Sequence, residues 1–269
     1  MAQAPGDGHT SSRDGNEPVL ALRGITKRFG GLVAVNDVSV DVKPAEVVAL
    51  VGDNGAGKST LMKITAGVYQ PSEGELLVDG ERRSFSGPDQ SRALGLEVVY
   101  QDLALAASQS VFMNMFLGRE LTRGPLRLLD KARMRRETAA GLKALDVHVP
   151  SVDSPVYNLS GGQRQGLAIG RATHWAQRIV LLDEPTAALG VQETKRVEQT
   201  IRRMRDRGLA VLMVSHDLDQ VFRLADRIYV LRRGRLAGER ITAETTGDEV
   251  VGLITGTSTT TVKGGPAFA

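Results

Sequence analysis

Short apolar runs alternate with polar, amphipathic stretches along most of the chain. The runs at 179–182, 210–214 and 227–231 have continuous apolar cores. Such strands are typical of parallel sheets that are covered on both faces. Seven β-strands are predicted from this pattern: Val19–Ile25, Ala34–Val42, Glu46–Val51, Gly74–Val78, Ile179–Leu182, Ala210–Val214 and Arg227–Leu231. We therefore expect an α/β sheet with ligand-binding loops at the ends of its strands.

Domain boundaries follow from changes in periodicity and composition. Residues 1–17 are rich in Gly, Asp and Ser, and residues 256–269 are rich in Gly and Thr, so loose or disordered tails are expected at both places. Residues 18–255 are expected to form one domain. Its stretch from about 102 to 158 lacks strand-like runs and carries helical patterns, namely Ala106–Leu117 and Lys131–Leu145. This stretch is predicted to be an inserted helical subdomain.

Composition excludes several classes of function. The 269 residues are 41% hydrophobic and 24% charged, which is ordinary for a globular protein. The net charge of +3 is too small to indicate a nucleic-acid partner, and the lack of cysteine excludes disulfides and thiolate metal sites. No apolar run approaches the ~18 residues that a membrane span needs. Any role at a membrane is therefore expected to depend on partner proteins.

The most specific chemical motif is Gly52–Ser59, which matches GxxxxGK[ST] between a predicted strand and a helical pattern. Its glycines let backbone N–H groups turn toward phosphate oxygens, and the helix N-terminus adds a favourable partial charge. Lys58 is expected to reach the β- and γ-phosphates of a nucleotide, and Ser59 is expected to bind Mg²⁺. The predicted nucleotide-binding residues of this P-loop are Gly52, Asp53, Asn54, Gly55, Ala56, Gly57, Lys58, Ser59 and Thr60.

A second motif is the apolar run Ile179–Leu182, which ends in Asp183 and Glu184. The buried strand places Asp183 at its carboxyl end, where the carboxylate can face a metal ion. Glu184 follows, where a carboxylate can orient an attacking water. An acidic pair after a strand is by itself more often a solvated turn. The P-loop in the same chain favours the catalytic interpretation.

A third motif, Leu-Ser-Gly-Gly-Gln at 159–163, precedes the helical run Leu167–Arg171. Its backbone N–H groups at a helix start suit a phosphate. The order of the three motifs resembles the ATP-binding subunits of ABC transporters over about Leu20–Arg240. The resemblance implies a P-loop NTPase core of the RecA type with an antiparallel β subdomain and the inserted helical subdomain. It also implies that this third motif, called the signature, meets the γ-phosphate of the ATP held by the other subunit, through Ser160, Gly161, Gly162 and Gln163.

The same resemblance gives roles to three further residues. Phe29 matches the aromatic residue that stacks on adenine, Gln101 matches a residue that touches Mg²⁺ and the attacking water, and His216 matches a residue that contacts the γ-phosphate. Isolated residues of these types are usually core or surface residues, but their order relative to the P-loop favours the functional roles. The expected catalytic residues are Glu184, His216, Lys58 and Gln101. The expected metal ligands are Ser59, Gln101 and Asp183.

The chain departs from the family pattern in Ala187-Ala188-Leu189-Gly190, because the family usually has aspartate at the last position. This form, together with Gly52–Gly57, resembles importers of the ribose, xylose and fructose class. The resemblance implies an ATP-hydrolysing subunit with Mg²⁺ that dimerises head to tail with a second copy. Integral-membrane permease subunits and, indirectly, a sugar-binding protein are the implied partners. The implied location is the cytoplasmic face of the cell membrane.

Two other functions are weighed against this one. A soluble ABC ATPase in DNA repair or translation is disfavoured, because residues 102–159 leave no room for a long coiled coil and there is no cysteine for a zinc site. Translation types usually carry two cassettes. A nucleotide-gated regulatory module without a transport role stays open. Basic clusters at 119–136, 195–207 and 232–240 are by default solvated faces, with contact to anionic lipid as the alternative.

Overall fold

The computed structural model describes residues 17–187 and 189–257, so most of both expected tails lies outside the described residues. Its strands are β1 (Leu20–Phe29), β2 (Leu32–Val42), β3 (Val47–Val51), β4 (Glu73–Val78), β5 (Glu81–Arg83), β6 (Leu96–Val99), β7 (Thr122–Arg123), β8 (Leu128–Leu129), β9 (Ile179–Asp183), β10 (Ala210–Val214), β11 (Arg227–Arg232) and β12 (Arg235–Ile241). Its helices are α1 (Lys58–Thr65), α2 (Pro88–Ala93), α3 (Val111–Met115), α4 (Lys131–Ala144), α5 (Gly161–Trp175), α6 (Val191–Asp206), α7 (Leu218–Leu224) and α8 (Gly247–Thr255), with short 3₁₀ turns at Val156–Asn158 and Thr242–Glu244.

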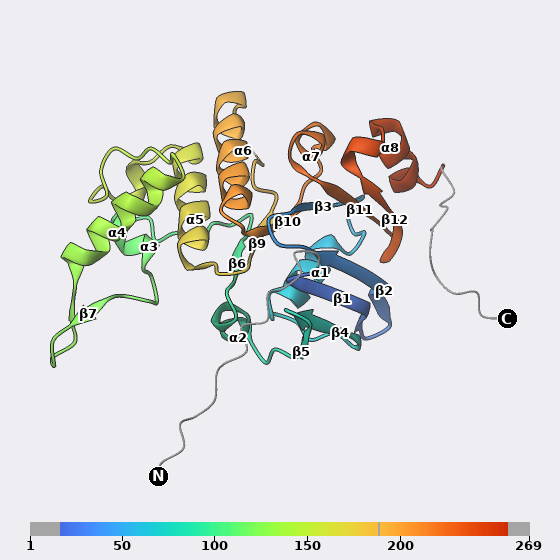
Figure 1. The fold of residues 1–269 in the computed structure, drawn as a ribbon, viewed down its shortest axis with the longest axis horizontal. Coiled ribbons are helices and arrows are strands. Elements are labelled where there is room, and N and C mark those ends of the chain that lie inside the picture. Colours follow the sequence, from blue (N-terminus) through green and yellow to red (C-terminus); the bar gives the residue numbers. More distant parts are fainter. Residues whose placement is uncertain (1–16, 188, 258–269) are drawn as a thin grey trace, which may run out of the picture.

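Two larger sheets enclose α1 between them (Figure 1). An antiparallel sheet has the order β2-β1-β4-β5, and a six-stranded sheet has the order β12-β11-β3-β10-β9-β6. The strands from β11 to β6 run parallel, whereas β12 pairs antiparallel with β11. Helices α5 to α8 cover the other face of the six-stranded sheet (Figure 1). The predicted α/β core with an antiparallel β subdomain is therefore confirmed.

The central strand β3 shows why its sequence is apolar throughout. Val48 and Leu50 belong to the core cluster shared with α1 and the antiparallel sheet. Val47, Ala49 and Val51 belong to the cluster shared with α5 to α8. Because side chains alternate between the two faces of a strand, both faces must be apolar when both are covered.

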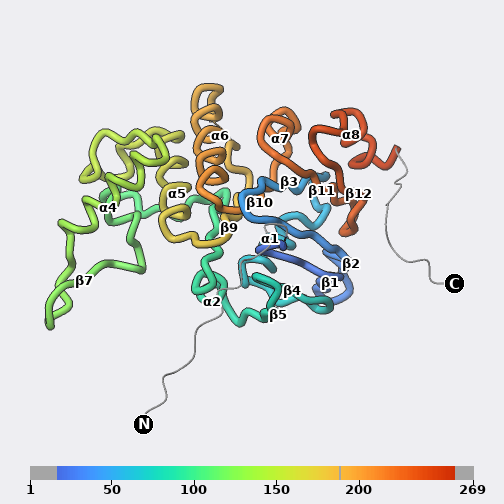
Figure 2. The backbone as a smooth tube through the Cα atoms, in the orientation of Figure 1, coloured from blue at the N-terminus to red at the C-terminus, as the bar shows by residue number. Residues whose placement is uncertain are grey.

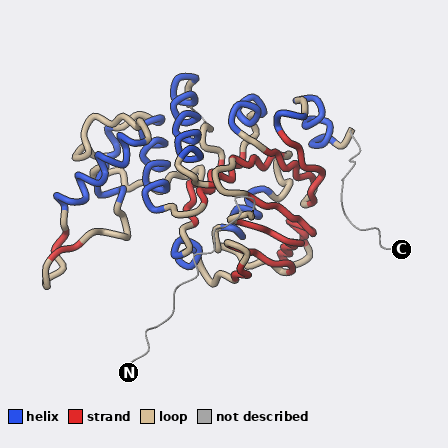
Figure 3. Tube along the Cα trace, in the orientation of Figure 1, coloured by secondary structure: helices blue, strands red, loops and turns tan. Residues whose placement is uncertain are grey.

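A helical lobe formed by α3, α4 and the start of α5 stands to one side of the sheets and has its own apolar core (Figures 1 and 2). The expectation that 102–158 lacks strands is wrong, because β7 and β8 pair as a short hairpin that projects from this lobe (Figure 3). The helix expected at Ala106–Leu117 is also too long. Ser110 caps α3, and the Asn114 side chain bonds the backbone N–H of Ala106 at 2.8 Å, so the preceding residues are held in a turn.

All seven predicted strands are present, and their order places the motif residues together. In the six-stranded sheet the P-loop follows β3, Asp183 ends β9 and His216 lies just beyond β10. Gln101 lies beyond β6, a strand absent from the predicted set. Since β3, β6, β9 and β10 run parallel, their carboxyl ends share one edge of the sheet. In the described ranges, no helix combines the length and the apolar character needed to cross a membrane.

Candidate functional site

The turn between β3 and α1 depends on glycine at two positions. Gly52 and Gly57 have φ of +147° and +105°, a region that other residues rarely adopt. A Cβ atom on Gly57 would lie 2.7 Å from the Ala34 carbonyl oxygen, and one on Gly52 would overlap the Leu231 carbonyl oxygen. The backbone can therefore close around an anion only because these side chains are absent.

Lys58 is the first residue of α1, and only 8% of its surface is exposed. Its Nζ donates hydrogen bonds to the carbonyl oxygens of Gly52 at 2.7 Å and Asp53 at 2.9 Å. Burial lowers the pKa of the Lys58 ammonium, and the nearby carboxylates, with Glu184 first, oppose that shift. Two of the three N–H groups are held by the loop, so one remains for a bound anion.

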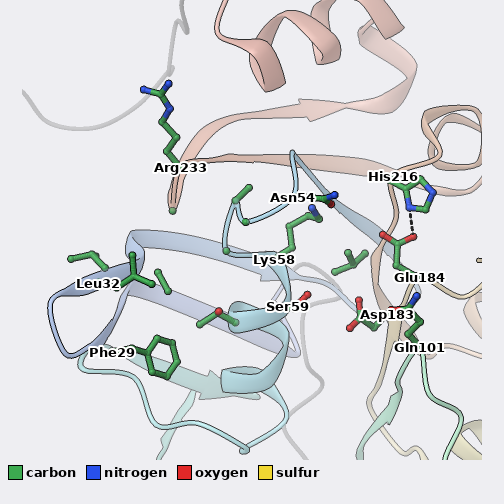
Figure 4. A pocket seen from close by; sticks show the side chains of 18 residues that line it. Phe29, Leu32, Asn54, Lys58, Ser59, Gln101, Asp183, Glu184, His216 and Arg233 are labelled. Carbon is green, nitrogen blue, oxygen red and sulfur yellow. Dashed lines mark ion pairs between the residues drawn. The ribbon is translucent and has the colours of Figure 1, made fainter.

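A cavity of about 970 Å³ lies at the carboxyl edge of the parallel strands (Figure 4). It brings together twelve of the residues predicted from the sequence: Phe29, Asn54, Gly55, Ala56, Gly57, Lys58, Ser59, Thr60, Gln101, Asp183, Glu184 and His216. Gly52 does not line the cavity but accepts a hydrogen bond from Lys58, and Asp53 lines a smaller adjoining hollow beside Arg232 and Arg233. The cavity is therefore built from segments far apart in the sequence.

Three titratable groups meet at one end of this cavity (Figure 4). His216 Nδ1 lies 2.7 Å from Glu184 Oε2, and Glu184 has a left-handed φ of +52°. The Glu184 backbone N–H donates to the Val214 carbonyl at 3.0 Å, which fixes the residue against the end of β10. Burial, and next the charge of Glu184, raise the pKa of the Asp183 carboxyl. The two adjacent carboxylates repel each other, so a cation beside them would be favoured.

Ser59, Gln101 and Asp183 offer a hydroxyl, an amide and a carboxylate oxygen to the same cavity. Oxygen donors with few carboxylates suit Mg²⁺, which keeps several waters and takes the rest of its ligands from a bound phosphate. In the described ranges no three His, Cys, Asp or Glu side chains form a metal cluster. The donor set therefore fits a metal that arrives with a nucleotide better than a resident protein-only site.

The opposite end of the cavity is apolar (Figure 4). Phe29 is 41% exposed and its ring packs edge-on against Tyr69, with centroids 5.3 Å apart. Leu32 and Val33, on the next strand, line the same end and are also exposed. An exposed aromatic ring beside aliphatic side chains suits a flat, apolar base. Leu32 and Val33 are absent from the residues predicted from the sequence, and their place directly after the Gly30-Gly31 turn is the one local sign of their role.

The signature residues Ser160, Gly161, Gly162 and Gln163 do not line this cavity. They open α5, where Ser160 Oγ accepts the Gln163 backbone N–H at 3.2 Å and the Gln163 side chain accepts the Ser160 N–H at 2.9 Å. This reciprocal capping box fixes the turn at the helix start. Within one chain the signature and the P-loop are therefore separate, each well formed.

Comparison with known proteins agrees with this geometry. The sequence matches the ABC transporter family over residues 35–187. The chain is 41% identical over 237 residues to the xylose/arabinose import ATP-binding protein XylG of Sulfolobus acidocaldarius, covering 88% of this chain and 94% of that protein. It is 43% identical over 225 residues to the fructose import ATP-binding protein FrcA of Rhizobium meliloti, covering 81% and 86%.

A solved structure extends the comparison to the fold. An ATP-binding cassette solved as a dimer in a post-hydrolysis state, bound to ADP and phosphate, matches with a TM-score of 0.71 and 26% identity. The match covers 83% of this chain and 98% of that one. The shared sequence, the shared fold and the cavity at the P-loop lead to one conclusion. The chain belongs to the ABC transporter family, as an ATP-binding ATPase of that family.

Proposed function

We propose that this protein is the ATP-hydrolysing subunit of a sugar importer, and that it works as a head-to-tail dimer on separate membrane subunits. The observation that carries the proposal is the convergence of Lys58, Asp183, Glu184 and His216 in one cavity while the signature stands apart. A complete P-loop site without its signature is what one half of a shared ATP site would look like. The second copy would then supply the missing half.

In the proposed reaction a water attacks the γ-phosphorus of ATP, and the bond to the β–γ bridging oxygen breaks to leave ADP and phosphate. Lys58 and the loop N–H groups hold the β- and γ-phosphates, so their charge is stabilised in place. Glu184 orients the water, and His216, which contacts that carboxylate, would also contact the γ-phosphate. Mg²⁺, held by Ser59, Gln101 and Asp183 and by the phosphates, would offset the negative charge.

The proposed dimer places the Ser160–Gln163 turn of each subunit over the ATP bound by the other. Support comes from the capped start of α5, whose free N–H groups and dipole favour an anion. A matching cassette was solved as a dimer with ADP and phosphate. Each composite site would thus need a P-loop from one chain and a signature from its partner.

The proposed partners are integral-membrane permease subunits and, through them, a sugar-binding protein. Support comes from relatives whose names describe import of xylose or arabinose and of fructose. The proposed location is the cytoplasmic face of the membrane, held there by the permease. Sugar recognition would then belong to the partner proteins, because the residues that line the large cavity of this chain suit a nucleotide rather than a sugar.

The test is the Glu184→Gln variant, whose amide keeps the shape of the carboxylate but lacks the charge that orients the attacking water. Size exclusion with Mg·ATP should show a dimer, nucleotide binding should be unchanged, and phosphate release should be nearly absent. Glu244→Gln, at an exposed 3₁₀ turn, is the matched control and should behave as the wild type. Wild-type hydrolysis in Glu184→Gln would contradict the proposed catalytic role.

Calorimetry tests the sugar assignment separately. The isolated chain should bind ATP and show no saturable heat with ribose, xylose or fructose. Direct binding of a monosaccharide would contradict the proposal that the partner proteins recognise the sugar. Co-purification with a permease would distinguish the importer from a regulatory module without a transport role.

A further inference from the structure

Two glycines from different parts of the chain face the side chain of Glu193. Gly162 is the second residue of α5, and Gly190 is the N-cap of α6. A Cβ atom on Gly162 would lie 2.9 Å from Glu193 Cβ and closer still to its Cγ. A Cβ atom on Gly190 would lie 2.7 Å from Glu193 Oε2. The Cβ and Cγ atoms of Glu193, its stem, therefore pack on the signature turn at Gly162. Its carboxylate occupies the space that a side chain at position 190 would need.

The carboxylate of Glu193 has no local capping role. In α5 and α8 the third helical residue bonds back to the N-cap residue: Gln163 to Ser160 and Glu249 to Thr246. Glu193 is the third residue of α6, but α6 begins at a glycine with no side-chain cap. Within residues 17–187 and 189–257 no hydrogen bond or ion pair engages the Glu193 carboxylate. Glu193 is partly buried, so its carboxylate is left available to a group outside the described residues.

Glu193 lies where the signature turn at the start of α5 meets the loop that runs from Glu184 to α6; we call this place the corner. Glu193, Ser160, Gly162 and Gln163 line one small hollow. Gly190 is the residue at which the chain departs from the aspartate usual in the family. Glycine at 190 is what leaves room for the Glu193 carboxylate.

We propose that Glu193 is a positioning residue with two effects. Its side chain fixes the position of the signature turn, and it supplies from α6 the carboxylate that the family usually has as an aspartate at position 190. The inference rests on the proposed head-to-tail dimer, in which this corner faces the ATP site of the partner. The stem of Glu193 holds Gly162 in place, and the acid lies at the surface that the partner would cover. Glu193 acts on the reaction only through this placement.

Two single substitutions separate packing from charge. Glu193→Gln keeps the stem against Gly162 and removes the charge, whereas Glu193→Ala removes both. Each should lower kcat by about 10- to 100-fold, the cost of a misplaced catalytic contact, with KM for ATP changed by less than about 2-fold because the P-loop is untouched. Gln192→Ala, on the same turn of α6, is the control and should keep wild-type turnover.

The decisive variant is the exchange Gly190→Asp/Glu193→Ala. It attaches the carboxylate to residue 190 instead of residue 193, and the group then lies at nearly the same place in space. Gly190→Asp alone should lose activity, because two acids would compete for one place. The double variant should recover at least about half of the kcat lost in Glu193→Ala. Thermal unfolding of each variant checks that the fold is retained.

Wild-type turnover in Glu193→Gln would overturn the role of the carboxylate, and wild-type turnover in both Glu193→Gln and Glu193→Ala would overturn the whole inference. A double variant no better than Glu193→Ala would overturn it as well, because a carboxylate at that place would then have no role. Failure of the proposed function looks different. In that case the wild-type protein itself would fail to hydrolyse ATP, or Gly162→Asp would leave it fully active.

Discussion

The molecule has two glycine-containing helix starts that suit phosphate, and they are built differently. The start of α1 has a left-handed glycine as N-cap and no side-chain cap, and it sits inside a cavity with walls from β2, β9 and the β11–β12 turn. The start of α5 is closed by a capping box and lies outside that cavity. The start of α1 is arranged to hold a nucleotide within its own chain. The start of α5 is a preformed turn that can contact only a nucleotide held by another chain. The difference indicates that each chain carries two unlike halves of a shared site.

The largest effect is expected at the first helix start. Lys58→Ala should lower ATP hydrolysis by about 1,000-fold or more, because Lys58 is the fixed charge on the β- and γ-phosphates. Phosphate release under saturating Mg·ATP measures the effect. Lys195→Ala on the exposed surface of α6 is the control and should be unaffected. Retained wild-type turnover would remove the P-loop assignment altogether.

The second helix start is tested by Gly162→Asp. The new side chain would collide with Glu193 and bring a carboxylate toward the γ-phosphate of the partner's ATP, so the pure homodimer should be inactive. Mixing it with Lys58→Ala chains puts both lesions into one composite site and leaves the other intact. Random pairing in a twofold dimer should then restore roughly a quarter of wild-type turnover, if one site can work alone.

One outcome of this experiment is unambiguous. Normal activity of the pure Gly162→Asp homodimer would mean that the signature does not touch ATP. The start of α5 would then have no role at the ATP site. A mixture without recovery would instead indicate that the two sites are strictly coupled.

A smaller effect is expected at the apolar end of the cavity. Phe29→Ala should raise KM for ATP about 5-fold, the value of roughly 1 kcal/mol of aromatic stacking, and leave kcat within about 2-fold. Tyr157→Ala, an exposed aromatic residue on the helical lobe, should change neither constant. An equal fall in kcat would place Phe29 in the chemistry rather than in base binding.

The smallest effect is expected from pH near neutrality. The raised pKa of Asp183 means that its carboxylate, and with it metal binding, is lost as the pH falls toward that value. The lowered pKa of Lys58 means that its charge is lost earlier on the alkaline side than for an ordinary lysine. Turnover should therefore fall on both sides and vary by less than about 2-fold between pH 7 and 8. A flat profile from pH 5 to 10 would contradict both assignments.

Much of the fold followed from local pattern. The continuous apolar runs of β9, β10 and β11 predicted a parallel sheet covered on both faces, and the glycines of the P-loop predicted the turn that joins β3 to α1. The helix expected at Ala106–Leu117 was wrong because Asn114 folds its side chain back onto Ala106, a contact that periodicity does not express. The β7–β8 hairpin was missed because its two-residue strands are too short to show alternation.

By itself, the sequence determined which motifs exist and which edge of the sheet they share, because parallel strands bring their carboxyl ends together whatever the connections between them. Only the tertiary structure decided which distant side chains meet. The pairing of His216 with Glu184, the apolar wall of Leu32 and Val33, and the carboxylate of Glu193 between Gly162 and Gly190 all join separate elements. Such contacts depend on how the helices pack, and that packing is set by the whole core rather than by neighbours in sequence.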